Sequence, residues 1–146
     1  MLSRTAEYLY WISRYMERAE TTARLLDVGY RMSLFPNPSG YNNEWESVLS
    51  AAGAIEGYKN KYDTIEQKNV EDYLFFDESN PSSVYNCILN ARNNALVVRT
   101  SFTPESWLAI NKTYQEILNL KEKKFTKSDL PDLTEWTIEQ VNLFRG

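Results

Sequence analysis

Arginine and glutamate side chains are the groups in this sequence with most capacity for chemistry, and the arginines are unevenly distributed. Five of them lie between residues 4 and 31, two lie at residues 92 and 99, and one lies at residue 145. The lysines instead fall within residues 59–68 and 112–127. Because Arg is preferred for buried bidentate pairing and Lys for solvated surfaces, this division predicts that some arginines lie inside the fold.

The spacing of these groups predicts that several of them share a helix face. Glu7 and Arg14 are seven residues apart, as are Trp11 and Arg18, and seven residues make about two turns of an α-helix. The same spacing separates the two arginines of segment 92–99. A cluster between helices is therefore expected, and it consists of Glu7, Arg14, Glu17, Arg18, Arg92, Asn94 and Arg99.

Two interpretations of this cluster remain open at the level of sequence. It is either a structural ion-pair network that fixes helix register or a pocket that binds an anion or a carboxylate. Under both interpretations, Glu17 and Arg18 are expected to be drawn inward with the neighbouring Trp11, Leu25 and Val28. Glu17→Ala is then expected to cost about 3 to 5 kcal/mol, because it would leave a buried charge unpaired.

Other kinds of reactive site are excluded by residue type. The sequence has no His and a single Cys, which excludes His-based catalytic triads, Cys/His zinc sites and an intrachain disulfide. Segment 77–80 lacks the Gly and the distal Glu of a calcium loop, so helix capping is expected there. Cys87 has no His to activate it and is expected to be a buried structural thiol. We expect no metal and no cofactor.

Composition and charge exclude further classes of protein. Lys and Arg number 16 against 20 Asp and Glu, giving a net charge of −4, so no excess of basic residues is available to bind nucleic acid. The longest uninterrupted aliphatic run, residues 95–98, is far shorter than the roughly 20 residues that span a bilayer. No nucleic-acid or membrane partner is expected, and a lone Cys is typical of a reducing, cytoplasmic location.

Apolar residues recur at helical spacing along the whole chain. In the first part, this pattern predicts a long helix from Ser3, as its N-cap, to Leu34. A short helix should open at a capping box of Asn43 and Glu46 and stop at Gly53, and another is expected over residues 68–76.

Apolar residues recur at helical spacing in the second part of the chain as well. A helix with Pro81 at its first position is expected to run to Phe102, and the next should open at Thr103 and end near Lys121. A last helix, capped by Asp132 and Glu135, completes the pattern. The sequence thus predicts an all-α bundle of about six or seven helices with a long N-terminal helix, forming one domain over residues 1–146.

Three stretches near the start of the chain, residues 1–11, 14–20 and 22–28, resemble the bacterial alpha-E family, which is named for a helical fold and a Glu-Arg motif. Further similarity lies in residues 80–83, in the 91–99 segment and in residues 144–146. Two departures are Asn93 and Leu96, where the family shows Glu and Arg.

The resemblance implies that this chain is the first half of a longer pseudo-repeated domain, because alpha-E proteins are about twice this length and carry a second Glu-Arg helix. It also implies a non-catalytic helical partner or scaffold, because such proteins accompany ATP-grasp proteins of the peptide-ligase type and transglutaminase-like proteins. The alternative is an enzyme in which Glu17 acts as acid or base while Arg14, Arg18 and Arg92 hold an anionic substrate. The resemblance assigns no catalytic residue.

Self-association is also expected, since a half-domain of this kind would leave apolar surface uncovered. The first helix around Trp11 and Leu25 and the last helix around Trp136, Val141 and Phe144 are the predicted surfaces. A two-fold dimer is the commonest arrangement for such contacts.

Overall fold

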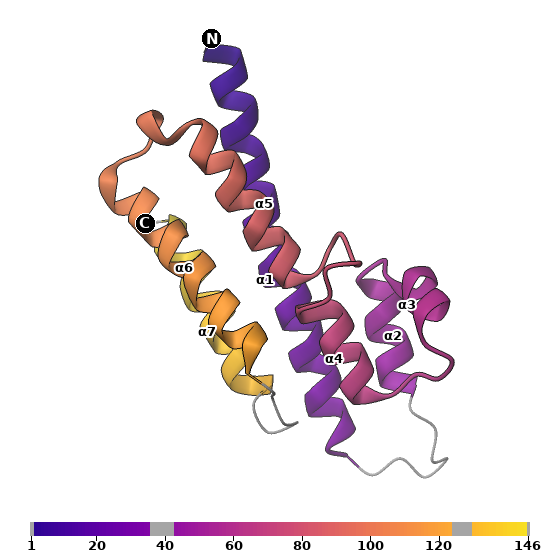
Figure 1. Ribbon diagram of the computed structural model, residues 1–146. Helices are drawn as coiled ribbons and strands as arrows, with labels where there is room; N and C mark the ends of the chain where they lie inside the picture. The colour runs from indigo at the N-terminus through magenta and orange to yellow at the C-terminus, as the bar shows by residue number, and fades with distance from the viewer. Residues whose placement is uncertain (1, 36–42, 124–129, 146) are drawn as a thin grey trace.

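A computed structural model describes residues 2–35, 43–123 and 130–145, and all regular structure in these ranges is helical. The predicted all-α fold with a long N-terminal helix is confirmed (Figure 1). The described helices are α1 (Leu2–Ser33), α2 (Asn43–Ala51), α3 (Ile55–Lys61), α4 (Gln67–Phe75), α5 (Val84–Val97), the 3-10 turn η1 (Arg99–Ser101), α6 (Pro104–Glu122) and α7 (Leu130–Arg145).

Helix α1 is the element against which most of the others pack. It contacts α2, α4, α5 and α7, and Figure 1 shows α5 running beside it in the opposite direction. Five residues of α1, spaced alternately by four and three, are fully or almost fully buried, which is the spacing of a helix-packing stripe. They are Ile12, Met16, Ala19, Ala23 and Leu26.

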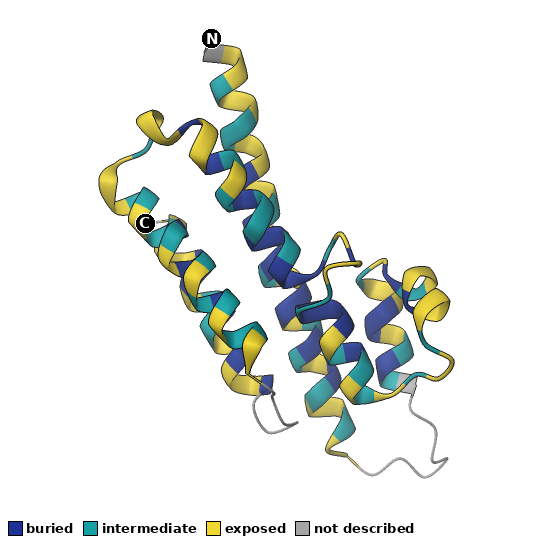
Figure 2. Ribbon diagram, in the orientation of Figure 1, coloured by how far each residue is buried: buried dark blue, intermediate teal, exposed yellow. Residues whose placement is uncertain are grey.

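Two clusters of buried residues form the core along this stripe. Figure 2, in which the ribbon is coloured by burial, shows buried positions where α1 and α5 run side by side. Ile12 and Met16 pack with residues of α5, α6 and α7, whereas Leu26 belongs to a larger cluster with α2, α3, α4 and α5. At Gly29 a Cβ atom would lie 2.7 Å from the Trp45 ring and 2.8 Å from Val48. Glycine is therefore required where α1 and α2 approach each other.

Several helix ends agree with the sequence prediction. Helix α2 stops before Gly53, which has φ +68°, and the Ala54 N–H donates to the Leu49 carbonyl at 2.9 Å, as in a Schellman motif. Helix α4 lies within one residue of its predicted range. At the start of α6, the Thr103 hydroxyl accepts a hydrogen bond from the Ser106 N–H, as expected of an N-cap. The Asn43 side chain lies outside what the structure describes.

Other boundaries were predicted wrongly. Ser3 is inside α1 rather than its N-cap, and the short α3 was not predicted. Helix α5 begins at Val84 with Ser83 as its N-cap, not at Pro81, because the Asn80 side chain accepts from the Ser82 N–H and holds residues 80–82 in a turn.

At the other end of α5, η1 follows the helix, so α5 does not continue to Phe102. Helix α7 begins at Leu130, which places Asp132 in its first turn and not at its cap.

Several apolar side chains of helix α7 pack against other parts of the chain. Val141 is 1% exposed, the Trp136 indole N–H donates to Glu116 Oε2 at 2.8 Å, and the Phe144 ring meets Phe102 edge-on at 6.3 Å. The Thr134 hydroxyl also donates to the Ala23 carbonyl of α1. Val141 is therefore too buried to contribute to a self-association surface, and Trp136 and Phe144 are partly buried by contacts within the chain.

Candidate functional site

The predicted Glu/Arg cluster does not form inside the bundle. Among the described residues, none of the buried side chains is charged. Arg14 and Glu17 form an ion pair of 3.6 Å on α1, with side chains 51% and 52% exposed, and Arg18 is exposed as well. The expectation that Glu17 and Arg18 are drawn inward is wrong, because the side of α1 that carries Trp11 and Val28 faces away from the core.

The arginines that follow on α5 and η1 are not part of the Arg14–Glu17 pair. Arg92 faces α6, where its Nε–H donates to Asn111 Oδ1 at 3.3 Å and its guanidinium lies 5.1 Å from the centre of the Tyr114 ring. Arg99 is exposed in η1.

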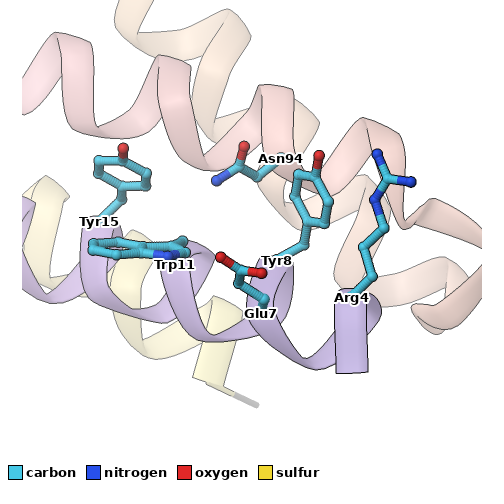
Figure 3. Close-up of a pocket in the computed structure, with 6 residues that line it drawn as sticks. All are labelled: Arg4, Glu7, Tyr8, Trp11, Tyr15 and Asn94. Carbon is cyan, nitrogen blue, oxygen red and sulfur yellow. The ribbon is translucent and has the colours of Figure 1, made fainter. Parts of the chain in front are cut away.

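Two members of the predicted cluster, Glu7 and Asn94, do come together. They line a pocket of about 330 Å³ between α1 and α5 (Figure 3). Sequence reasoning missed the other lining residues, although four of them recur on α1 at steps of four, three and four, which places them along one side of a helix. We call this the α1–α5 pocket, and its lining residues are Arg4, Glu7, Tyr8, Trp11, Tyr15 and Asn94.

Aromatic rings form the walls of the α1–α5 pocket. The Trp11 and Tyr15 rings lie 6.1 Å apart, tilted by 41°, and Tyr10 meets the Trp11 indole edge-on at 5.4 Å. Figure 3 shows the Glu7 carboxylate and the Arg4 guanidinium on either side of Tyr8. The pocket thus offers aromatic faces and one charge of each sign.

An ion-pair network does join two helices, but around a residue that sequence analysis did not select. One oxygen of Glu20 accepts from Arg24 at 2.9 Å, and its other oxygen lies 3.1 Å from Arg145 at the end of α7. The Glu20 side chain is 14% exposed. This network joins α1 to α7, and none of its three residues belongs to the predicted cluster.

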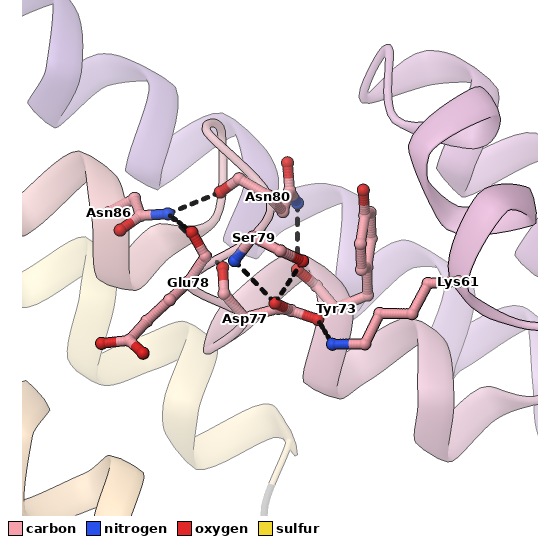
Figure 4. A network of polar contacts seen from close by, with 7 residues as sticks. All are labelled: Lys61, Tyr73, Asp77, Glu78, Ser79, Asn80 and Asn86. Carbon is pink, nitrogen blue, oxygen red and sulfur yellow. Dashed lines mark hydrogen bonds and ion pairs between the residues drawn. The ribbon is translucent and has the colours of Figure 1, made fainter.

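A second polar network joins the loop after α4 to its surroundings (Figure 4). Asp77 pairs with Lys61 and accepts hydrogen bonds from the N–H and hydroxyl of Ser79, at 2.8 and 2.6 Å. Burial would raise the pKa of Asp77, but the hydrogen bonds from Lys61 and Ser79 outweigh it and hold this pKa below its ordinary value. The carboxylate is thus engaged by the protein itself. It stabilises a turn and caps no helix, because the N-cap of α5 is Ser83, so the helix-capping role predicted for segment 77–80 is wrong.

Asparagine side chains complete this network. The amide of Asn80 donates to the Tyr73 carbonyl at 2.9 Å, and that of Asn86 donates to the carbonyls of Glu78 and Asn80 at 2.9 and 2.8 Å. Asn is a poor helix former, and these hydrogen bonds compensate for placing Asn86 in the first turn of α5.

Cys87 is the buried structural thiol that the sequence predicts. Its thiol donates a hydrogen bond to the Ser82 carbonyl oxygen, with Sγ 3.7 Å from that oxygen. Burial raises the pKa of this thiol to about 12, against a smaller lowering effect of the Arg18 charge. A thiol with this pKa is almost entirely protonated at neutral pH and is a poor nucleophile.

Neither a metal-binding cluster nor a membrane-spanning helix occurs in the described ranges. Within those ranges, no three Cys, Asp or Glu side chains are placed to hold a metal ion together. None of the helices there has both the length and the apolar composition of a membrane span.

Comparison with known proteins gives one match. The model of the Alpha-E family, described as a predicted alpha-helical domain with a conserved ER motif, matches residues 1–146. Comparisons with curated proteins and with solved structures give no match.

Proposed function

Because this chain belongs to the Alpha-E family, we propose that it is a non-catalytic helical partner of an ATP-grasp protein of the peptide-ligase type, in a system that makes or modifies peptides. The resemblance of its opening segments to alpha-E proteins suggests the class of partner. The exposed side of α1 supports a role in binding, and this is the observation on which the proposal rests.

The exposed side of α1 has the spacing of a helix-packing surface. Eight residues follow one another at alternating steps of four and three, the pattern with which one helix packs along another. All are exposed except Leu25, which is partly buried. We call this the outer face of α1, and it consists of Glu7, Trp11, Arg14, Arg18, Thr21, Leu25, Val28 and Met32.

The residue types on the outer face are those of a protein interface. Trp11, Val28 and Met32 are 41%, 50% and 56% exposed, and Arg14 and Arg18 lie between them along the helix. Trp, Met and Arg are enriched in protein–protein interfaces, where Trp and Arg also contribute most of the hot spots. Scattered apolar residues are ordinary on a surface. A row of them at the spacing with which one helix packs along another indicates a binding surface.

The alternative enzyme with an anion pocket is less well supported. It requires Arg92 beside Glu17, Arg14 and Arg18, whereas Arg92 is held by Asn111 and Tyr114 of α6. The three residues on α1 remain on an open surface, without enclosing walls that exclude water.

Calorimetry with the purified ATP-grasp protein of the same system tests the proposal. We expect binding by the wild-type chain and at least about tenfold weaker binding by Trp11→Ala and by Arg18→Ala, as for hot-spot residues. Leu108→Ala is the matched control, because Leu108 is 66% exposed on α6 and lies outside the outer face. The proposal fails if the wild-type chain does not bind, or if the control weakens binding as much as the two variants.

A further inference from the structure

The α1–α5 pocket combines aromatic walls with an acidic side chain, and we infer that it binds an ammonium group carried on an alkyl stem, as in a lysine side chain or a free alkylamine. This inference goes beyond the proposed function, because it concerns a small cationic group and does not depend on the ATP-grasp partner. It shares Glu7 and Trp11 with the outer face, so its test is made on the chain alone.

The aromatic side chains provide the attraction for a cation. Trp11 and Tyr15 present rings 6.1 Å apart, and Tyr8 contributes a third ring to the same pocket. The negative face of an aromatic ring attracts a cation within about 6 Å of its centre, and Trp is the strongest of the three aromatic types. Trp11 is 41% exposed, so its indole is accessible to a ligand.

The Glu7 carboxylate provides the opposite charge. Within the described ranges, no Lys or Arg nitrogen lies within 4.0 Å of its oxygens. Glu17, about three turns further along α1, is instead neutralised by Arg14 at 3.6 Å. The pocket therefore contains a carboxylate whose charge remains available to an incoming cation.

The remaining lining residues set limits on the ligand. A volume of about 330 Å³ is at the lower end of the range for small-molecule sites. Arg4 lies on the other side of Tyr8 from Glu7 (Figure 3), so it repels a second positive charge at that end. A single ammonium group on an apolar stem satisfies both limits, whereas a diamine of similar length does not.

Ligand-detected NMR on the full chain, with no partner present, tests this inference. The probes are N-acetyl-lysine methylamide and n-butylamine, with the ε-acetylated lysine derivative and n-butanol as neutral counterparts. We expect saturation transfer to at least one cationic probe and about fivefold weaker binding of its neutral counterpart. Binding of the lysine derivative alone identifies a peptide-borne ligand, and equal binding of n-butylamine identifies a simple amine.

Variants separate the pocket from the rest of the surface. Glu7→Gln and Trp11→Leu are expected to weaken binding of the cationic probe by at least about threefold. Glu17→Gln removes an exposed carboxylate from the same helix outside the pocket and should leave binding unchanged. The inference is overturned if no cationic probe binds, if the neutral probes bind equally well, or if Glu17→Gln has the same effect as Glu7→Gln.

Discussion

Glu17 and Glu20 lie one turn apart on α1, but their surroundings differ. Glu17 is about half exposed and has one partner at 3.6 Å, whereas Glu20 is 14% exposed and joins Arg24 of its own helix to Arg145 of α7. Exposed ion pairs contribute at most about 1 kcal/mol, and hydrogen bonds to charged groups contribute about 1.5 to 3 kcal/mol.

These surroundings predict different costs for the two alanine substitutions. Glu17→Ala should lower the free energy of unfolding by less than about 1 kcal/mol, and Glu20→Ala by about 1.5 to 3 kcal/mol. Urea unfolding of both variants beside the wild type measures the difference. A larger loss for Glu17→Ala than for Glu20→Ala would contradict the exposed position of Glu17.

The buried thiol of Cys87 leads to a prediction about reactivity. With its pKa raised to about 12 by burial, Cys87 should not react with a disulfide reagent at pH 8 in the folded chain. It should react at once in denaturing urea, where burial is lost and the ordinary thiolate fraction returns. The absorbance of the released thiolate reports both rates, and rapid reaction in the folded chain would contradict the burial of Cys87.

At the scale of elements, the loop after α4 should make the free energy of unfolding depend on pH in the acid range. The pKa of Asp77 is lower in the folded chain than its ordinary value, so the unfolded chain binds more protons as the pH falls. The stabilisation is complete above about pH 5 and is lost as the pH drops through the folded pKa. We therefore expect a smaller acid-induced loss of stability in Asp77→Asn than in the wild type, measured as urea midpoints from pH 6 to 3.

Asp72 provides a control of opposite sign for this measurement. Burial raises the pKa of Asp72, against the lowering effect of the Lys68 charge, so this group favours the folded state as the pH falls. Asp72→Asn should therefore steepen the acid-induced loss. If Asp77→Asn and the wild type lose stability in parallel, the Lys61–Asp77 pair does not contribute in the way its geometry indicates.

Which elements were predictable depended on how local their causes are. The start of α6 follows from Thr103 and the end of α2 follows from Gly53, because the effects of both residues act within a few positions of the chain. The start of α5 depends on the Asn80 side chain, which competes with Pro81 by holding a turn, and such competition cannot be seen in apolar spacing. The short α3 has a single buried residue, Tyr58, too little to produce a periodic pattern.

The candidate site was only partly predictable for a related reason. Spacing shows which residues share a helix face, but it does not show which face meets the core, or that Glu7 of α1 lines a pocket with Asn94 of α5. Helix α1 carries two stripes with the same four-and-three spacing. The stripe of Ile12 and Met16 is buried, and the stripe of Arg14 and Arg18 is consequently left outside.

At the scale of the whole molecule, the outer face of α1 predicts how two copies of the chain pack against each other. If two copies pair along the outer face as antiparallel helices about a two-fold axis between Arg18 and Thr21, Trp11 lies opposite Val28 of the second copy. Arg14 then lies opposite the second copy's Leu25. In the same register, Glu17 flanks Arg24 of the second copy, which is the position where opposite charges select antiparallel partners.

This arrangement predicts a dimer that depends on α1 and not on α7. We expect light scattering after gel filtration to give a dimer mass at tens of micromolar, and Val28→Asp to give a monomer mass, because it places an unpaired charge opposite Trp11. Leu108→Asp, on the exposed side of α6, should remain dimeric. A stable dimer would bury about 1,200 Å² or more in total, which requires most of the outer face rather than the α1–α5 pocket alone. A wild-type chain that stays monomeric at these concentrations would leave the outer face to a different protein, and a monomeric Leu108→Asp would place the contact on α6.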